Sequence, residues 1–254
     1  MSSWNLENKK VLITGGTKGI GKATLLAFAE LGAQIIFTAR NAEEVLITER
    51  EFTAKGNLVY GLSADVTLVK DRLAVIDFIE NKWGKLDVLI NNAGMNIRKK
   101  TIEYTEEEYQ KVYQTNFFSA FEFCRLCHKY LVASKKASVI NVASVAGSFD
   151  VGTGSPYATS KAAMIQLSRS LAVEWAKDGI RVNTVSPWFT VTPLTDSYLA
   201  NVDKLKQIED RTPIGRVAQA EEVASAIAFL AMDKASYISG QHLMIDGGLS
   251  SGIF

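Results

Sequence analysis

The sequence predicts an α/β fold, a doubly wound sheet of seven parallel strands with helices on both faces. Short β-branched or apolar runs alternate with longer helical patterns along the chain, which is typical of a parallel sheet covered on both sides. No linker, repeat or low-complexity stretch interrupts this alternation. Right-handed crossovers then give the doubly wound arrangement. With 254 residues, 47% of them hydrophobic, the chain can build one large core, so we expect a single domain over 1–254.

The predicted elements alternate in chain order. Each strand is a short run rich in Val, Ile and Leu, and the runs are 11–14, 35–38, 58–60, 88–90, 139–142, 182–185 and 243–245. Helical patterns occupy 20–31, 42–55, 68–83, 106–131, 157–177 and 221–232. The connection 188–217 shows no clear strand. Because a connection of that length in a compact domain is usually functional, we expect a substrate loop there.

Charge and hydropathy argue against several classes of function. The chain has 28 Lys and Arg against 27 Asp and Glu, so its net charge of +1 provides no field for nucleic acid. No apolar run reaches the roughly 20 residues that a membrane helix needs. Residues 1–7 lack the basic and apolar regions of a signal peptide. We therefore expect a soluble, cytoplasmic protein.

A glycine-rich turn follows the first predicted strand and opens the first helix. Residues 14–21 read TGGTKGIG, with the spacing Gly-x-x-x-Gly-x-Gly in place of the usual Gly-x-Gly-x-x-Gly. Glycines allow a tight turn and the close approach of a pyrophosphate to the helix N-terminus. We therefore expect dinucleotide contacts from Gly15, Thr17, Lys18, Gly19, Ile20 and Gly21.

The end of the second predicted strand bears on the choice of cofactor. Sites for NAD usually place an Asp or Glu there, but residues 37–40 read FTAR. Arg40 can pair with a 2′-phosphate, and Lys18 adds a second positive charge, which favours NADPH over NADH. The alternative is that both are solvated surface charges.

Polar residues follow the third and fourth predicted strands. We expect Asp65 and Val66 beside the adenine, while Asp65 also suits an N-cap of the next helix, and both roles are compatible. Residues 91–94 read NNAG, where small residues let the backbone pass close to a cofactor and an Asn amide ties neighbouring strands. Cofactor contacts are expected from Asn92, Ala93 and Gly94, with an ordinary turn as the alternative.

Tyr157 and Lys161 lie four residues apart on a predicted helix and share one face. An ammonium beside a phenol favours the phenolate, so Lys161 is expected to lower the pKa of Tyr157 from its usual value of about 10. Tyr157 then serves as proton donor and acceptor near neutral pH. Taken alone, the pair also fits a plain contact on a helix surface.

Cys124 and Cys127 form a Cys-x-x-Cys motif followed by His128. A redox pair and half of a zinc site are both possible readings. A zinc site needs about four ligands, however, and the other histidine, His242, is distant in sequence. Because the pair lies in a largely apolar helical segment, we expect packed structural cysteines and no metal.

The order of these motifs resembles the short-chain dehydrogenase/reductase family over essentially the whole chain. It runs through the glycine turn, Asp65, residues 91–94, Asn116, Ser144, Tyr157 with Lys161, and Pro187. Segments 96–104 and 211–217 resemble the tropinone-reductase-like subgroup, and 235–240 with the Asp-Gly-Gly at 246–248 end the chain as that family does. The resemblance implies a Rossmann-type fold and a nicotinamide cofactor.

The resemblance also implies a catalytic tetrad. Tyr157 is the expected general acid in reduction, and Ser144 orients the carbonyl oxygen. Lys161 holds the nicotinamide ribose, and Asn116 fixes a water that links Lys161 to solvent. Such aimed donors stabilise the alkoxide charge that hydride transfer creates. Further cofactor contacts are expected from Pro187, Thr190 and Thr192.

The chain departs from the family after the sixth predicted strand. The usual Pro-Gly is Pro187-Trp188 here, while Thr192 keeps its place. A large aromatic at this point suggests an apolar substrate wall, with simple packing of the loop as the alternative. We expect the substrate to contact Met95, Phe149, Val151, Trp188, Phe189, Leu194 and Tyr198, with Ser144 and Tyr157 at its reacting end.

The expected function is reduction of a neutral, fairly apolar ketone by NADPH, since no clear carboxylate-binding arginine stands out. A 3-oxoacyl-thioester reductase and a sugar-acid dehydrogenase are the enzyme alternatives. A catalytically dead dinucleotide sensor or scaffold is a third, and the complete tetrad argues against it. The family also implies a homotetramer that packs through 106–131 and 157–177, with 252–254 either reaching a neighbouring subunit or fraying.

Overall fold

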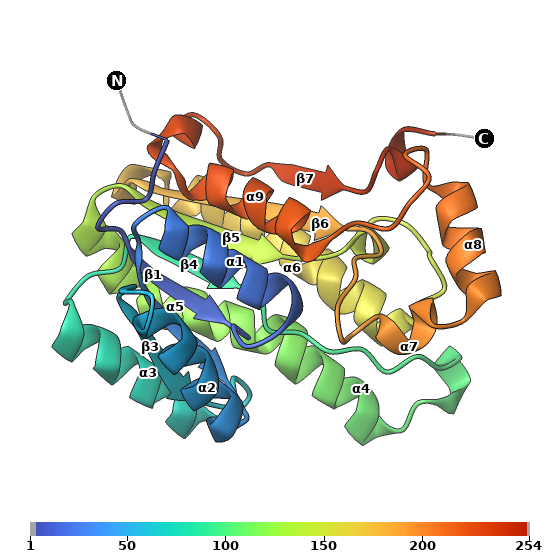
Figure 1. Ribbon diagram of the computed structural model, residues 1–254, viewed down its shortest axis with the longest axis horizontal. Coiled ribbons are helices and arrows are strands. Elements are labelled where there is room, and N and C mark those ends of the chain that lie inside the picture. The colour runs from blue at the N-terminus through green and yellow to red at the C-terminus, as the bar shows by residue number, and fades with distance from the viewer. Residues whose placement is uncertain (1–3, 253–254) are drawn as a thin grey trace.

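One sheet of seven parallel strands runs through the molecule, as the sequence predicts (Figure 1). The structure, a computed structural model, describes residues 4–252. The strands are β1 (Lys10–Thr14), β2 (Gln34–Ala39), β3 (Val59–Ser63), β4 (Val88–Asn91), β5 (Ala137–Val142), β6 (Ile180–Pro187) and β7 (His242–Ile245). Their spatial order is β3-β2-β1-β4-β5-β6-β7, and every neighbouring pair is parallel.

Helices cover both faces of the sheet because successive side chains of each strand point to opposite sides. The core on one face joins α1 (Gly19–Glu30), α2 (Ala42–Thr53) and α9 (Ala220–Ala231), with Ile13 and Phe37 pointing into it. The other face carries α3 (Val69–Lys82), α5 (Ser119–Ser134) and α6 (Ser155–Glu174), and Leu12 and Ile36 point that way. Both cores are apolar, so the strands read as continuous hydrophobic runs.

The structure corrects one predicted segment and adds short helices to another. The single helix expected over 106–131 consists of α4 (Glu106–Tyr113), a π-helical turn (Gln114–Phe118) and α5. The connection 188–217 carries α7 (Asp196–Leu199) and α8 (Val202–Arg211), and Thr190 forms an isolated bridge to Ala218. Hydrophobic spacing does not distinguish a π turn from an α turn, which explains the first difference.

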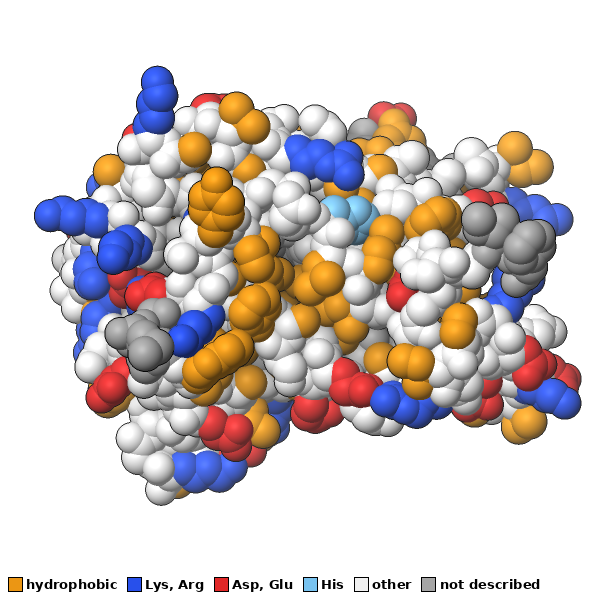
Figure 2. Space-filling model, turned by 90° about the horizontal axis from the view of Figure 1, so that it is seen from above, with side chains coloured by type: hydrophobic (Ala, Val, Ile, Leu, Met, Phe, Trp, Pro, Cys, Tyr) orange, Lys and Arg blue, Asp and Glu red, His pale blue; other side chains and the backbone are white. Residues whose placement is uncertain are grey.

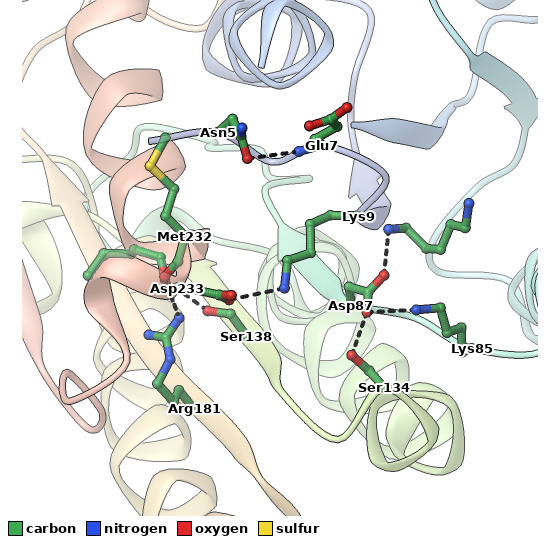
Figure 3. Close-up of polar contacts among 12 residues, drawn as sticks. Asn5, Glu7, Lys9, Lys85, Asp87, Ser134, Ser138, Arg181, Met232 and Asp233 are labelled. Atoms are coloured by element: carbon green, nitrogen blue, oxygen red, sulfur yellow. Dashed lines mark hydrogen bonds and ion pairs between the residues drawn. The ribbon is translucent and has the colours of Figure 1, made fainter. Parts of the chain in front are cut away.

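The amino edge of the sheet is closed by polar contacts (Figure 3). Asp87, just before β4, accepts hydrogen bonds from the first backbone N–H of β1 at 2.8 Å and from the Ser134 hydroxyl. Lys9 pairs with Asp233 at 3.0 Å, and Arg181 donates to carbonyls at the end of α9. The polar groups at this edge therefore have partners within the protein, as buried polar groups normally do.

The opposite, carboxyl edge contains the switch point of the topology. From β1 the chain moves outward to β2 and β3, and it then returns to place β4 on the other side of β1. Ligands of open α/β sheets bind in the crevice beyond such a point. No helix within residues 4–252 is both long and apolar enough to cross a membrane.

Candidate active site

A cavity of ≈ 520 Å³ opens beyond the carboxyl ends of the strands. Its size lies within the range of small-molecule and cofactor sites. Every residue that the sequence predicts to contact the cofactor lines its wall, from the glycine turn through Arg40, Asp65 and residues 92–94 to Thr192. The fold therefore brings together side chains from six segments that are distant in sequence.

The glycine turn forms a cradle that larger residues would fill. Gly15 has φ +72, and a Cβ at Gly21 would lie 1.9 Å from the Gly15 carbonyl oxygen. The Asn92 side chain donates to the carbonyls of Thr14 (2.9 Å) and Gly15 (3.0 Å), which fixes the turn against β4. The backbone at the start of α1 thus faces the cavity without side chains in the way. This geometry fits a dinucleotide pyrophosphate.

The end of β2 presents positive charge to the cavity. Within residues 4–252, the Arg40 side chain makes no hydrogen bond or ion pair, so its guanidinium is free for an anion. Lys18 instead pairs with Glu44 at 2.6 Å, and Glu44 also lies 3.5 Å from the Thr17 hydroxyl. Sequence reasoning missed Glu44, which lines the same wall. The signal was available, because the first turn of a helix after a parallel strand lies beside that strand's carboxyl end.

Asp65 sits in the cavity wall but does not cap α3. Its carboxylate accepts from the backbone N–H and the hydroxyl of Thr67 at 2.9 and 2.7 Å, closing an Asx turn, while the N-cap of α3 is Leu68. The prediction that Asp65 is the N-cap is therefore wrong, because the helix begins three residues later. Asn91 ties strands as expected, since its amide donates to Asn141 on β5 at 2.8 Å.

The π turn places Asn116 against the strand edge. Its side-chain oxygen accepts from the Met95 N–H at 2.8 Å, and its amide donates to the Met95 carbonyl at 3.0 Å and the Ser160 hydroxyl at 3.1 Å. A Cβ at Gly94 would lie 3.4 Å from the Asn116 oxygen and 3.5 Å from the Lys161 nitrogen. Asn116 does not line the cavity itself, but it lies behind Gly94 on the same side as Lys161. π turns inside helices occur frequently at functional sites.

Lys161 is buried, with 3% of its surface exposed, on the first half of α6. Its ammonium donates to the Val142 carbonyl at 2.8 Å and lies 5.8 Å from the centre of the Tyr157 ring. Burial lowers the pKa of Lys161 to about 8. The amine therefore carries its charge only partly in mildly alkaline solution.

Tyr157 does not behave as the sequence suggested. Burial raises the pKa of its phenol above the usual value, while a hydrogen bond with Ser144 and the charge of Arg98 act in the opposite direction. The expected lowering of the Tyr157 pKa by Lys161 is wrong for this arrangement, because desolvation outweighs the Ser144 hydrogen bond and the charge of Arg98, and Lys161 is not among the groups that shift this pKa. Ser144, which begins the turn after β5, also accepts from the Ala146 N–H at 3.2 Å.

The cavity contains part of the wall that the sequence predicts for the substrate. Of the expected apolar residues, Val151, Trp188, Phe189 and Leu194 line it, whereas Met95, Phe149 and Tyr198 do not. Trp188 is held by a hydrogen bond from its indole N–H to the Thr212 hydroxyl at 3.1 Å. Sequence reasoning missed several polar members of the same wall, among them Asn96, Arg98, Thr115 and Thr153.

The two cysteines lie away from this cavity. Cys124 and Cys127 are free and belong to the core under α5, and burial raises the pKa of the Cys124 thiol to about 12. Within residues 4–252, no group of three or more His, Cys, Asp or Glu side chains is placed to hold a metal ion.

Comparisons with known proteins agree with this architecture. A family model described as "Enoyl-(Acyl carrier protein) reductase" matches residues 15–250. Two tropinone reductase homologs of Arabidopsis thaliana are 45% and 41% identical, over 98% and 97% of this chain and 93% and 94% of their own lengths. They match the chain almost end to end.

Solved structures are equally similar in fold. A short-chain type dehydrogenase/reductase from Mycobacterium marinum superposes with a TM-score of 0.92 at 31% identity, covering 98% of both chains. A gluconate 5-dehydrogenase from Burkholderia cenocepacia, in complex with NADP and tartrate, gives 0.94 at 30% identity, with 98% of both chains covered. The chain therefore belongs to the short-chain dehydrogenase/reductase family, among its tropinone-reductase-like members, and is an oxidoreductase.

Proposed function

We propose that this protein is an NADPH-dependent carbonyl reductase. The observation that carries the proposal is the meeting of Ser144, Tyr157 and Lys161 in one cavity with the glycine cradle at the carboxyl edge of the sheet. When bound, NADPH supplies the hydride, and the protein supplies position and electrostatics. The complete constellation also argues against a catalytically dead sensor or scaffold.

The roles proposed for the side chains follow from their contacts. Tyr157, protonated because burial raises its pKa, gives its proton to the carbonyl oxygen. Ser144 donates to the same oxygen and stabilises its developing charge. Lys161 holds the nicotinamide ribose. Asn116 hydrogen-bonds the backbone of Met95 and so fixes the end of the segment 92–95 that follows β4. Proton return through a water near Asn116 is part of this proposal.

The preference for NADPH rests on the free guanidinium of Arg40. A 2′-phosphate provides the two acceptor oxygens that such a fork binds. The Burkholderia cenocepacia gluconate 5-dehydrogenase structure contains NADP, which supports the proposal by similarity. A higher kcat/KM with NADH than with NADPH, measured with the same ketone, would contradict it.

The residues of the cavity wall bear on the class of ketone. A neutral, apolar ketone was expected from the aromatic loop and from the lack of an obvious carboxylate-binding arginine. Arg98 in the cavity wall removes the second ground and favours the sugar-acid alternative. The test is a panel of neutral and acidic ketones with NADPH and NADH in parallel, and the absence of any turnover would overturn the proposed function.

We also propose a homotetramer. β7 is an edge strand, and the face that carries it shows a band of hydrophobic side chains (Figure 2). Leu243 on β7 is exposed, as is Tyr237 in the segment that leads to β7. On the interface predicted through 106–131 and 157–177, Phe121 on α5 and Val173 on α6 are exposed. A monomer in light scattering at micromolar concentration would contradict this. The contact expected from residues 252–254 falls mostly outside the described residues, and the cytoplasmic location stays a prediction.

A further inference from the structure

Arg98 is a positively charged side chain in the cavity wall without an acidic partner. It follows β4 in the segment after residues 91–94, at the carboxyl edge of the sheet, and it lines the cavity together with Ser144 and Tyr157. Within residues 4–252, its guanidinium makes no hydrogen bond or ion pair. The neighbouring Lys99, by contrast, is paired with Glu108.

We propose that Arg98 binds a carboxylate of the substrate, so that the enzyme acts on oxo acids and hydroxy acids. This inference rests on the proposed reductase function and names its substrate class. A guanidinium in a fixed place binds a planar carboxylate through two parallel hydrogen bonds. No carboxylate of the described chain occupies that position, which leaves these donors available to a ligand.

The loop 188–217 holds the guanidinium over an aromatic ring. The Arg98 guanidinium carbon lies 5.0 Å from the centre of the Tyr198 ring on α7, and Tyr198 is stacked on Phe189 at 5.2 Å. Contact with a ring face limits the guanidinium's freedom without using its N–H donors. Tyr198, which does not line the cavity, thus acts on the substrate through Arg98.

Arg98 and Tyr157 line the same cavity, so one ligand in that cavity can contact both side chains. The charge of Arg98 also acts on the Tyr157 phenol, where it opposes the rise in pKa that burial causes. A carboxylate bound by Arg98 and a carbonyl bound by Tyr157 can therefore belong to one substrate.

The wall beside Arg98 is polar. Asn96, Thr115 and Thr153 line the cavity together with Arg98, and the Asn96 amide donates to the Thr153 carbonyl at 3.1 Å. A wall with these polar groups suits a substrate with hydroxyl groups better than an apolar ketone.

The test measures binding, so it does not depend on finding the natural substrate. Tartrate is titrated by calorimetry into the free enzyme and into its complex with NADP+, and threitol, which has the same carbon chain without charge, serves as the neutral probe. Arg98→Gln removes the guanidinium, and Lys99→Gln is the matched control because it removes a neighbouring charge that lies outside the cavity.

The wild type is expected to bind tartrate at least about tenfold more tightly than threitol, since charge-assisted bidentate contacts are the strong ones. Arg98→Gln should weaken the affinity for tartrate by about 10- to 100-fold and leave the affinities for threitol and NADP+ unchanged. Lys99→Gln should change the affinity for tartrate by less than about twofold.

Equal binding of the two probes by the wild type, or equal tartrate binding by wild type and Arg98→Gln, would overturn the inference. Failure of the wild type to bind NADP+ would instead overturn the proposed function. Titration of the free enzyme measures tartrate binding without the cofactor, so the two failures are distinguishable.

Discussion

Replacing Lys161 with methionine removes a buried amine whose pKa lies at about 8 instead of 10.5. In the unfolded chain the amine keeps its usual pKa, so below pH 8 both states hold the proton and the folded state contains a charge that burial disfavours. The interval between 10.5 and about 8 corresponds to roughly 3 kcal/mol, at about 1.4 kcal/mol per pH unit. Methionine has a similar length and no charge, so the variant lacks this cost.

The sign of the pH dependence follows from proton binding. Between pH 8 and 10.5 the unfolded chain binds this proton and the folded protein does not, so wild-type stability rises with pH. Lys161→Met also loses the hydrogen bond to Val142, which costs about 1 kcal/mol at every pH. The variant should therefore be about 2 kcal/mol more stable than wild type at pH 7 and about 1 kcal/mol less stable above pH 10.5.

The difference in the free energy of unfolding between Lys161→Met and wild type is measured by urea unfolding, followed by tryptophan fluorescence. The measurement is made at several pH values between 7 and 10.5 and at a fixed protein concentration. Tyr157 is the titratable neighbour of Lys161, and it is present in both proteins. Lys206→Met, at an exposed position, is the control for general alkaline effects and should show no such trend. A stability difference between Lys161→Met and wild type that stays constant across this range would refute the reasoning that burial sets the Lys161 pKa.

Three further predictions concern the cavity. Tyr157→Phe should keep NADP+ affinity within about twofold and lower kcat by about 10²–10⁴-fold, and a near-normal kcat would contradict its role as proton donor. Gly21→Ala places a Cβ 1.9 Å from the carbonyl oxygen of Gly15, so it should abolish NADP+ binding in calorimetry and lower the free energy of unfolding by about 2 kcal/mol. Glu44→Gln frees Lys18 and should tighten NADP+ roughly fivefold in fluorescence titrations with little change for NAD+, whereas an unchanged ratio of the two affinities would argue against competition by Glu44.

Much of the fold follows from local patterns. Seven short apolar runs and the helical segments between them predict the parallel sheet, because strand and helix periods are properties of a few neighbouring residues. The glycine turn is placed for the same reason, since φ +72 at Gly15 and the contact at Gly21 admit little else. The π turn at Asn116 was not predictable in this way, because it depends on the bonds to Met95 and Ser160 from other segments.

The sequence by itself determined the class of fold, the glycine turn after the first strand and many, but not all, of the residues that meet beyond the strand ends. Only the tertiary structure decided how those residues behave. It buries Lys161, raises the pKa of Tyr157, pairs Lys18 with Glu44 and brings Arg98 to the reacting end. Solvation and the distances between groups set these pKa values and charge pairings. Both depend on segments far apart in the chain, so residue types and their spacing in the sequence do not predict them.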